Sequence, residues 1–92
     1  MKNLPKVRNM LSDNNRKLPN QYIIETDNAT LFQSYETIIA KREGGQLYLD
    51  ESYWDYSPTT AKYRNRFTGL DTKETKARIK SGEVKLVNLN NG

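Results

Sequence analysis

Residues that mark the two ends of a helix place the strongest limit on what this chain can fold into. Ser57 and Pro58 together mark a helix start, because a serine hydroxyl can cap free backbone N–H groups and proline suits the first helical position. Gly69 suits the left-handed residue that follows the last turn of a helix. The spacing predicts a short helix that runs to about Phe67.

A second pair of boundary residues follows directly. Asp71 or Thr72 can cap the start of another helix, which is predicted to run through Lys80 and to end at Gly82. The chain therefore carries two consecutive short helices in its C-terminal half.

The segments on either side of these helices have the character of strands. β-Branched and aromatic residues dominate residues 21–26 and 30–42. Two glycines then separate residues 30–42 from residues 46–49, which is the signal of a two-residue hairpin turn. Residues 84–89 alternate apolar and polar side chains and predict a final strand. The predicted fold is α+β, with a small antiparallel sheet of hairpins plus a C-terminal strand and two short helices packed on one face.

Length and composition limit the chain to one small domain and its ends. It has 92 residues, of which 35% are hydrophobic, and this suffices for one thin core that we expect within residues 20–92. Residues 1–19 are rich in Asn, and Leu4, Val7 and Leu11 follow a helical spacing over at most two turns. They predict a basic N-terminal arm with a marginal helix. No apolar run is long enough for a signal peptide or a membrane span, so we expect a cytoplasmic protein.

The absence of two residue types excludes several chemistries. The chain has neither cysteine nor histidine, which rules out thiol nucleophiles, disulfides, Cys/His zinc sites and histidine bases. Asp50, Glu51 and Asp55 carry oxygen ligands that suit Mg²⁺ or Mn²⁺, but their spacing matches no metal-binding loop, and a solvated acidic turn accounts for them. We therefore expect no metal, no cofactor and no enzymatic activity. A nuclease that binds its metal through carboxylates alone stays the catalytic alternative.

The net charge of +4 is distributed unevenly along the chain. Residues 1–17 have five basic and one acidic side chain, residues 18–61 have two basic and seven acidic ones, and residues 62–92 have eight basic and three acidic ones. This asymmetry indicates an anionic partner for the C-terminal part.

Basic side chains follow both predicted helices at helical spacing. The first helix places Lys62 and Arg66 as an i, i+4 pair, with Arg64 beside the aromatic residues of that helix. The second helix has three lysines on one face at i, i+3 and i+7, namely Lys73, Lys76 and Lys80. Such stripes can contact phosphate groups, so these six residues are the candidate nucleic-acid-binding set. The alternative is a solvated helix surface.

Aromatic residues crowd the segment just before the first helix. Trp54, Tyr56 and Tyr63 are the candidate rings for stacking on bases or contacting a partner. The alternative is that such rings belong to the core and its rim, and this alternative is favoured for Tyr63 and Phe67.

Three strings together resemble a known family. They are NQYII at residues 20–24, FQSY at residues 32–35 and WDYSPTTAKY at residues 54–63. They are similar to a family of small uncharacterised domains carried by bacteriophages, plasmids and conjugative elements, over about residues 7–89. The resemblance implies a setting in mobile DNA within a bacterial host cell, and it supplies no catalytic residues.

Three functional hypotheses follow. The leading one is a small non-enzymatic phage or mobile-element protein that binds DNA or RNA through its basic C-terminal helical face. The alternative is an inhibitor of a host defence nuclease, of the anti-CRISPR or anti-restriction type, that acts by binding the nuclease or its nucleoprotein complex. A third is a small oligomeric module such as a homodimer.

Overall fold

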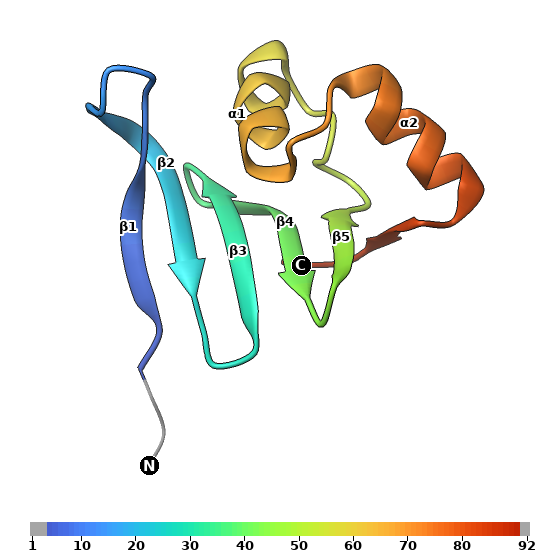
Figure 1. Cartoon of the computed structure of the whole chain (residues 1–92), viewed down its shortest axis with the longest axis horizontal. Coiled ribbons are helices and arrows are strands. Elements are labelled where there is room, and N and C mark those ends of the chain that lie inside the picture. The colour runs from blue at the N-terminus through green and yellow to red at the C-terminus, as the bar shows by residue number, and fades with distance from the viewer. Residues whose placement is uncertain (1–3, 91–92) are drawn as a thin grey trace.

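One mixed sheet with two helices makes up the part of the chain that the computed structural model describes, residues 4–90 (Figure 1). The first five elements are the strands β1 (Lys6–Leu11), β2 (Lys17–Glu25), β3 (Ala29–Ser34), β4 (Thr37–Glu43) and β5 (Gln46–Asp50). The helices α1 (Pro58–Thr68) and α2 (Thr72–Ser81) follow, and the strand β6 (Val84–Val87) comes last. The predicted α+β class is confirmed.

The order of strands in the sheet is the order of strands in the sequence, from β1 at one edge to β6 at the other. Neighbours from β1 to β5 are antiparallel, whereas β6 pairs with β5 in parallel. The predicted antiparallel sheet of hairpins is confirmed from β1 to β5, and the C-terminal strand differs in that it pairs in parallel. The two helices between β5 and β6 form a crossover that returns the chain to the starting end of β5, and this connection requires a parallel neighbour.

The predicted boundaries of the first helix are confirmed. The Ser57 hydroxyl accepts a hydrogen bond from the backbone N–H of Thr60 at 3.1 Å, and Pro58 occupies the first turn. Gly69 ends α1 with φ 79°, a conformation that glycine adopts without steric strain.

The boundaries of the second helix are confirmed as well. The carboxylate of Asp71 accepts a hydrogen bond from the N–H of Glu74 at 2.7 Å. The Glu74 carboxylate in turn accepts a hydrogen bond from the N–H of Asp71. This reciprocal pair is a capping box, and Gly82 ends the helix.

The predicted strand over residues 30–42 is in fact two strands, β3 and β4. A tight turn at Tyr35 and Glu36 separates them, and Tyr35 has a positive φ of 56°. Glycine, proline, asparagine and aspartate are all absent from this stretch, so Ser34 is its one typical turn residue and its composition gives only a weak indication of the turn. The hairpin predicted at Gly44 and Gly45 is confirmed.

The predicted marginal helix in the N-terminal arm is wrong. Residues 6–11 form β1, which pairs with β2 in a register that places Val7 opposite Ile24. Leu4, Val7 and Leu11 are 83%, 63% and 44% exposed, so their spacing reflects no buried helical face. So short a helix is marginal by itself, whereas pairing with β2 satisfies the backbone of the segment. Residues 1–3 of the predicted arm lie outside the described residues.

The core lies on one face of the sheet, under the helices. The registers align Ile23, Phe32, Ala40 and Leu49 in one row across β2 to β5, and each is at most 8% exposed. Phe67 of α1 stacks on Phe32 with 6.0 Å between the ring centroids. Tyr63 and Ile79 also pack against this cluster, as predicted for the rings of the first helix.

The opposite face of the sheet is not covered by the helices. Side chains alternate along a strand, so Tyr22 and Ile24 point away from the row that contains Ile23. A second row therefore crosses this face from β1 to β6 and consists of Val7, Ile24, Leu31, Lys41, Tyr48 and Lys85. We call this surface the open face.

Candidate functional site

The three lysines predicted on the second helix are all exposed. Lys73, Lys76 and Lys80 have no acidic partner among the ion pairs of the described residues, and we call them the lysine row. Arg78 of the same helix pairs with Glu83 at 3.3 Å. The capping box pairs the N–H groups of Asp71 and Glu74 at the start of α2, and the exposed lysine side chains add positive potential to this helix.

The basic residues of the first helix have different environments. Lys62 is exposed, and its ammonium lies 5.4 Å from the centroid of the Tyr63 ring. Arg66 donates hydrogen bonds to the carboxylate of Asp13 at 2.7 Å and to the carbonyl of Leu11 at 2.6 Å. Arg66 therefore links α1 to the turn between β1 and β2.

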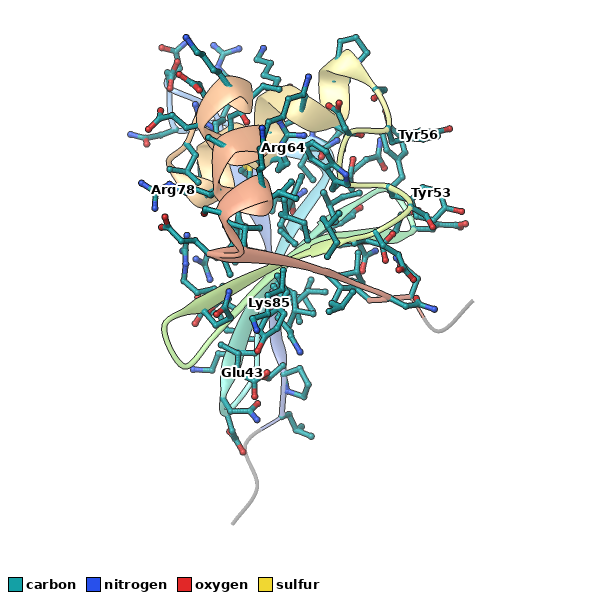
Figure 2. The ribbon with its side chains drawn as sticks, turned by 90° about the vertical axis from the view of Figure 1, so that its right-hand side faces the viewer. Glu43, Tyr53, Tyr56, Arg64, Arg78 and Lys85 are labelled. Atoms are coloured by element: carbon teal, nitrogen blue, oxygen red, sulfur yellow. The ribbon has the colours of Figure 1, made fainter. Side chains whose placement is uncertain are left out.

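Arg64 is fully buried, so the prediction that it contacts phosphate is wrong. Its guanidinium donates to the Trp54 carbonyl at 2.5 Å and to the Asp55 carboxylate at 3.3 Å. It also donates to the Asn65 amide oxygen at 3.0 Å and to the Thr72 hydroxyl at 2.9 Å. The guanidinium lies 5.2 Å from the Trp54 ring centroid, and Figure 2 shows the side chain inside the helical layer. Arg64 joins α1, the start of α2 and the preceding segment.

The three candidate aromatic rings do not form one surface. Trp54 and Tyr63 are half-buried and pack against the core. Tyr56 is 70% exposed and meets Tyr53 edge to face, with 5.8 Å between the ring centroids. Figure 2 shows Tyr53 and Tyr56 on one side of the molecule and α2 on the other. The structure therefore does not bring Tyr56 together with the lysine row.

The acidic segment contains one buried carboxylate, so a solvated turn does not describe it fully. Asp50 is 2% exposed and accepts four hydrogen bonds of 2.8 to 3.0 Å, from the backbone N–H groups of Ser52, Tyr53 and Leu89 and from the Asn90 amide. Within residues 4–90, no group of three or more acidic side chains is placed to hold a metal ion. Asp50 instead links the end of β5 to the segment that follows β6.

A cleft beside the end of the first helix brings together arginines that the sequence did not group. Arg8 of β1, Arg42 of β4 and Arg66 of α1 line a cavity of about 390 Å³, which we call the arginine cleft. Arg8 pairs with Glu25, whereas Arg42 lies over the Phe67 ring and donates to backbone carbonyls of α1. Arg8 and Arg42 are far apart in the sequence, so only the sheet register could have indicated this juxtaposition.

A larger hollow brings together four tyrosines, of which only Tyr56 was a sequence candidate. Tyr22, Tyr35, Tyr53 and Tyr56 all line a cavity of about 970 Å³. The alternation of side chains in β2 could have placed Tyr22 on the open face, but nothing local indicated Tyr35, because its turn was not predicted.

The contact between Arg66 and Asp13 should make the stability of the protein depend on pH. The hydrogen bond from Arg66 and the positive charge of its guanidinium lower the pKa of the Asp13 carboxyl below 3.8. A lowered pKa in the folded state stabilises the protein at pH values above 3.8, and this contribution is lost as the pH falls through the folded-state pKa. We expect the Asp13→Asn variant to melt below the unmodified protein at pH 7. The difference should shrink in a series of thermal melts taken toward pH 3, and a constant difference would contradict the ion pair.

Comparison with known proteins identifies the chain only at the level of a family. No helix in the described part of the chain is long and apolar enough to cross a membrane. No curated protein and no solved structure gives a significant match to the chain. A family model described as a family of unknown function, DUF8033, matches residues 5–83. These residues include all of the strands β1 to β5 and both helices, so the chain belongs to the DUF8033 family.

Proposed function

We propose that this protein is a non-enzymatic nucleic-acid-binding accessory protein of a bacteriophage or plasmid, with α2 as its phosphate-contacting element. The observation that carries the proposal is the lysine row, in which all three side chains are exposed and none has a carboxylate partner among the described residues. The mobile-element setting is supported by the resemblance of the strings at residues 20–24, 32–35 and 54–63 to domains carried by such elements.

The spacing of the lysine row suits a phosphate backbone. Lys73 and Lys80 are seven residues apart, which corresponds to about 10 Å along a helix that rises about 1.5 Å per residue. Successive phosphates of one DNA strand advance about 3.4 Å along the duplex axis, so the row spans about three of them. Arg42 in the arginine cleft supplies further positive charge without an ion pair among the described residues, and Lys62 on α1 is a further exposed cation.

This mode of binding depends on charge and has little sequence specificity. Lysine ammonium groups contact phosphates, which are the same in every sequence, and the exposed Tyr53 and Tyr56 rings lie away from α2 (Figure 2). We therefore propose DNA or RNA backbone as the ligand, with Arg64 acting in the fold alone.

Salt dependence tests this proposal directly. The assay is fluorescence anisotropy with labelled single- and double-stranded DNA and RNA at several salt concentrations. Replacing all three lysines of the row by glutamine should reduce the slope of log K against log salt by about 2 to 3, because each lost phosphate contact removes about 0.7 to 0.9. A matched control replaces Lys6 of β1, Arg16 of the following turn and Lys17 of β2 by glutamine, which lowers the net charge by the same amount and should leave most of the slope.

Two outcomes would contradict the proposal. One is an equal loss of slope in both triple variants, because the binding would then depend on net charge and not on α2. The other is no binding to any of these nucleic acids at low salt. In that case the inhibitor of a host defence nuclease becomes the hypothesis to test, by capture of a partner from host lysate after nuclease treatment.

A further inference from the structure

The hollow with four tyrosines lies partly on the open face and reaches the first turn of α1, which contributes Thr60. Its floor includes Tyr22, Ile24 and Gln33, which the registers place on the open face together with Val7. Its wall comes from the turn between β3 and β4 and from the segment before α1. The remaining lining residues are Asn20, Ser34, Tyr35, Glu36, Thr37, Ile39, Tyr53, Tyr56 and Thr60.

The charge of the hollow is negative. Glu36 is its one charged lining residue, and no lysine or arginine from residues 4–90 lines it. Lys6 and Arg8 alternate with Val7 on β1 and therefore point to the other face of the sheet. On the open face itself, Lys41 lies over the Tyr48 ring at 5.0 Å and pairs with the carboxylate of its neighbour Glu43 at 3.1 Å. The chain as a whole is basic, so this local absence of positive charge distinguishes the hollow.

The tyrosine rings offer the surface that a cation prefers. Tyr53 and Tyr56 meet at an interplanar angle of 68°, and they are 39% and 70% exposed. The faces of aromatic rings are electronegative and attract ammonium and guanidinium groups, most strongly where several rings and a carboxylate surround the cation. Figure 2 shows both rings projecting outward from the segment before α1.

Tyr35 has a backbone conformation that its side chain does not favour. Only three non-glycine residues in the described part of the chain have a positive φ, and the other two are Asn15 and Asn20. Asparagine tolerates this conformation well, whereas a bulky aromatic residue is strained in it. The strained Tyr35 is 59% exposed at the rim of the hollow, so no core packing accounts for an aromatic residue there. Strained residues of this kind cluster at active sites and ligand-binding sites.

We propose that the hollow binds an arginine or lysine side chain from a basic peptide segment of a partner protein. The rings of Tyr35, Tyr53 and Tyr56 contact the cation and its aliphatic stem, and the Glu36 carboxylate pairs with its charge. A nucleic acid is disfavoured as the occupant, because its phosphates would face Glu36 without a basic residue in the lining. This site is separate from the lysine row and does not depend on the function proposed for α2.

The test uses a short capped peptide of alternating glycine and arginine. Titration of the full-length protein, followed by NMR, should shift the ring signals of the tyrosines that line the hollow and leave the Tyr48 ring unmoved. Peptides with leucine or glutamate in place of arginine are the matched ligands and should produce no comparable shift. The Glu36→Gln variant should bind the arginine peptide several-fold more weakly, whereas Glu51→Gln, an exposed acidic residue that does not line the hollow, should bind it normally.

Replacement of Tyr35 by asparagine separates a binding role from a structural one. Because asparagine suits a positive φ, the Tyr35→Asn variant should melt at the same temperature as the unmodified protein or higher, yet lose affinity for the arginine peptide at least tenfold. The Tyr56→Phe variant should keep the affinity, because the ring face and not the hydroxyl contacts the cation, whereas Tyr56→Ala should lose it.

Several results would overturn the proposal. One is a shift of the tyrosine ring signals with the leucine peptide equal to that with the arginine peptide. Another is a larger shift with the glutamate peptide or with an oligonucleotide. A third is a shift of these signals that depends on protein concentration without any ligand, which would assign the hollow to a second copy of the chain. Full retention of binding by Tyr35→Asn and Tyr56→Ala would do the same. None of these results bears on the salt slope of the lysine row, so the two proposals fail independently.

Discussion

Replacement of Arg64 by alanine should destabilise this protein strongly. Its guanidinium donates four hydrogen bonds and is fully buried, so the alanine variant loses these bonds and leaves a cavity beside the Trp54 ring. Loss of such a large buried side chain typically costs about 3 to 5 kcal/mol, and the freed carbonyl of Trp54 adds to this. In a domain of this size that corresponds to a fall in melting temperature of roughly 15 °C or more, measurable by calorimetry.

Two further variants make this prediction specific. Arg64→Lys should recover only a small part of the stability, because one ammonium cannot reproduce the fork of planar donors that reaches acceptors in different segments. Lys62→Ala, two residues away on the same helix but exposed, should change the stability by about 0.5 kcal/mol or less. A loss below about 1 kcal/mol for Arg64→Ala would contradict the role assigned to this side chain.

Replacement of Asp50 by alanine should also destabilise the protein strongly. The variant leaves the N–H groups of Ser52, Tyr53 and Leu89 and the Asn90 amide without their shared acceptor. Hydrogen bonds to a buried carboxylate are stronger than neutral ones, so we expect a loss of about 3 kcal/mol in the free energy of unfolding, measured by urea denaturation.

The amide and a neighbouring acid provide the comparisons for Asp50. Asp50→Asn keeps one acceptor oxygen but turns an NH₂ group toward backbone donors, so its stability should lie between those of the aspartate and the alanine forms. Glu51→Ala removes an exposed carboxylate next in the sequence and should be nearly neutral. Equal effects at the two positions would show that charge in this segment matters and not the four hydrogen bonds.

The elements with local chemical signals could be predicted from the sequence. Ser57, Gly69, Asp71 and Gly82 determine the helix ends through their own side chains or backbone freedom, and all four act in the structure as expected. The lysine row could be predicted for the same reason, because three lysines at helical spacing share a face wherever the helix lies.

Features that depend on distant partners could not be predicted. Val7 lies in a strand because β2 offers a pairing partner, and the residues next to Val7 in the sequence do not reveal this partner. Tyr35 lies in a turn with a positive φ that a bulky aromatic residue disfavours, so the composition of residues 30–42 predicted one continuous strand. In the sequence, Arg64 resembles the other basic residues of α1. It is buried because residues 54–72 surround its side chain in the fold.

Positive charge is concentrated on α2 and is absent from the lining of the tyrosine hollow, and this uneven distribution gives the protein an electric dipole. The helix α2 has four basic side chains against one acidic one and packs on the covered side of the sheet, whereas Tyr53 and Tyr56 of the hollow with Glu36 lie away from α2 (Figure 2). A dipole aligns with the field of any highly charged body it approaches, before contact is made. A polyanion would therefore draw the protein in with its helices foremost and leave the tyrosines directed toward the surrounding solution.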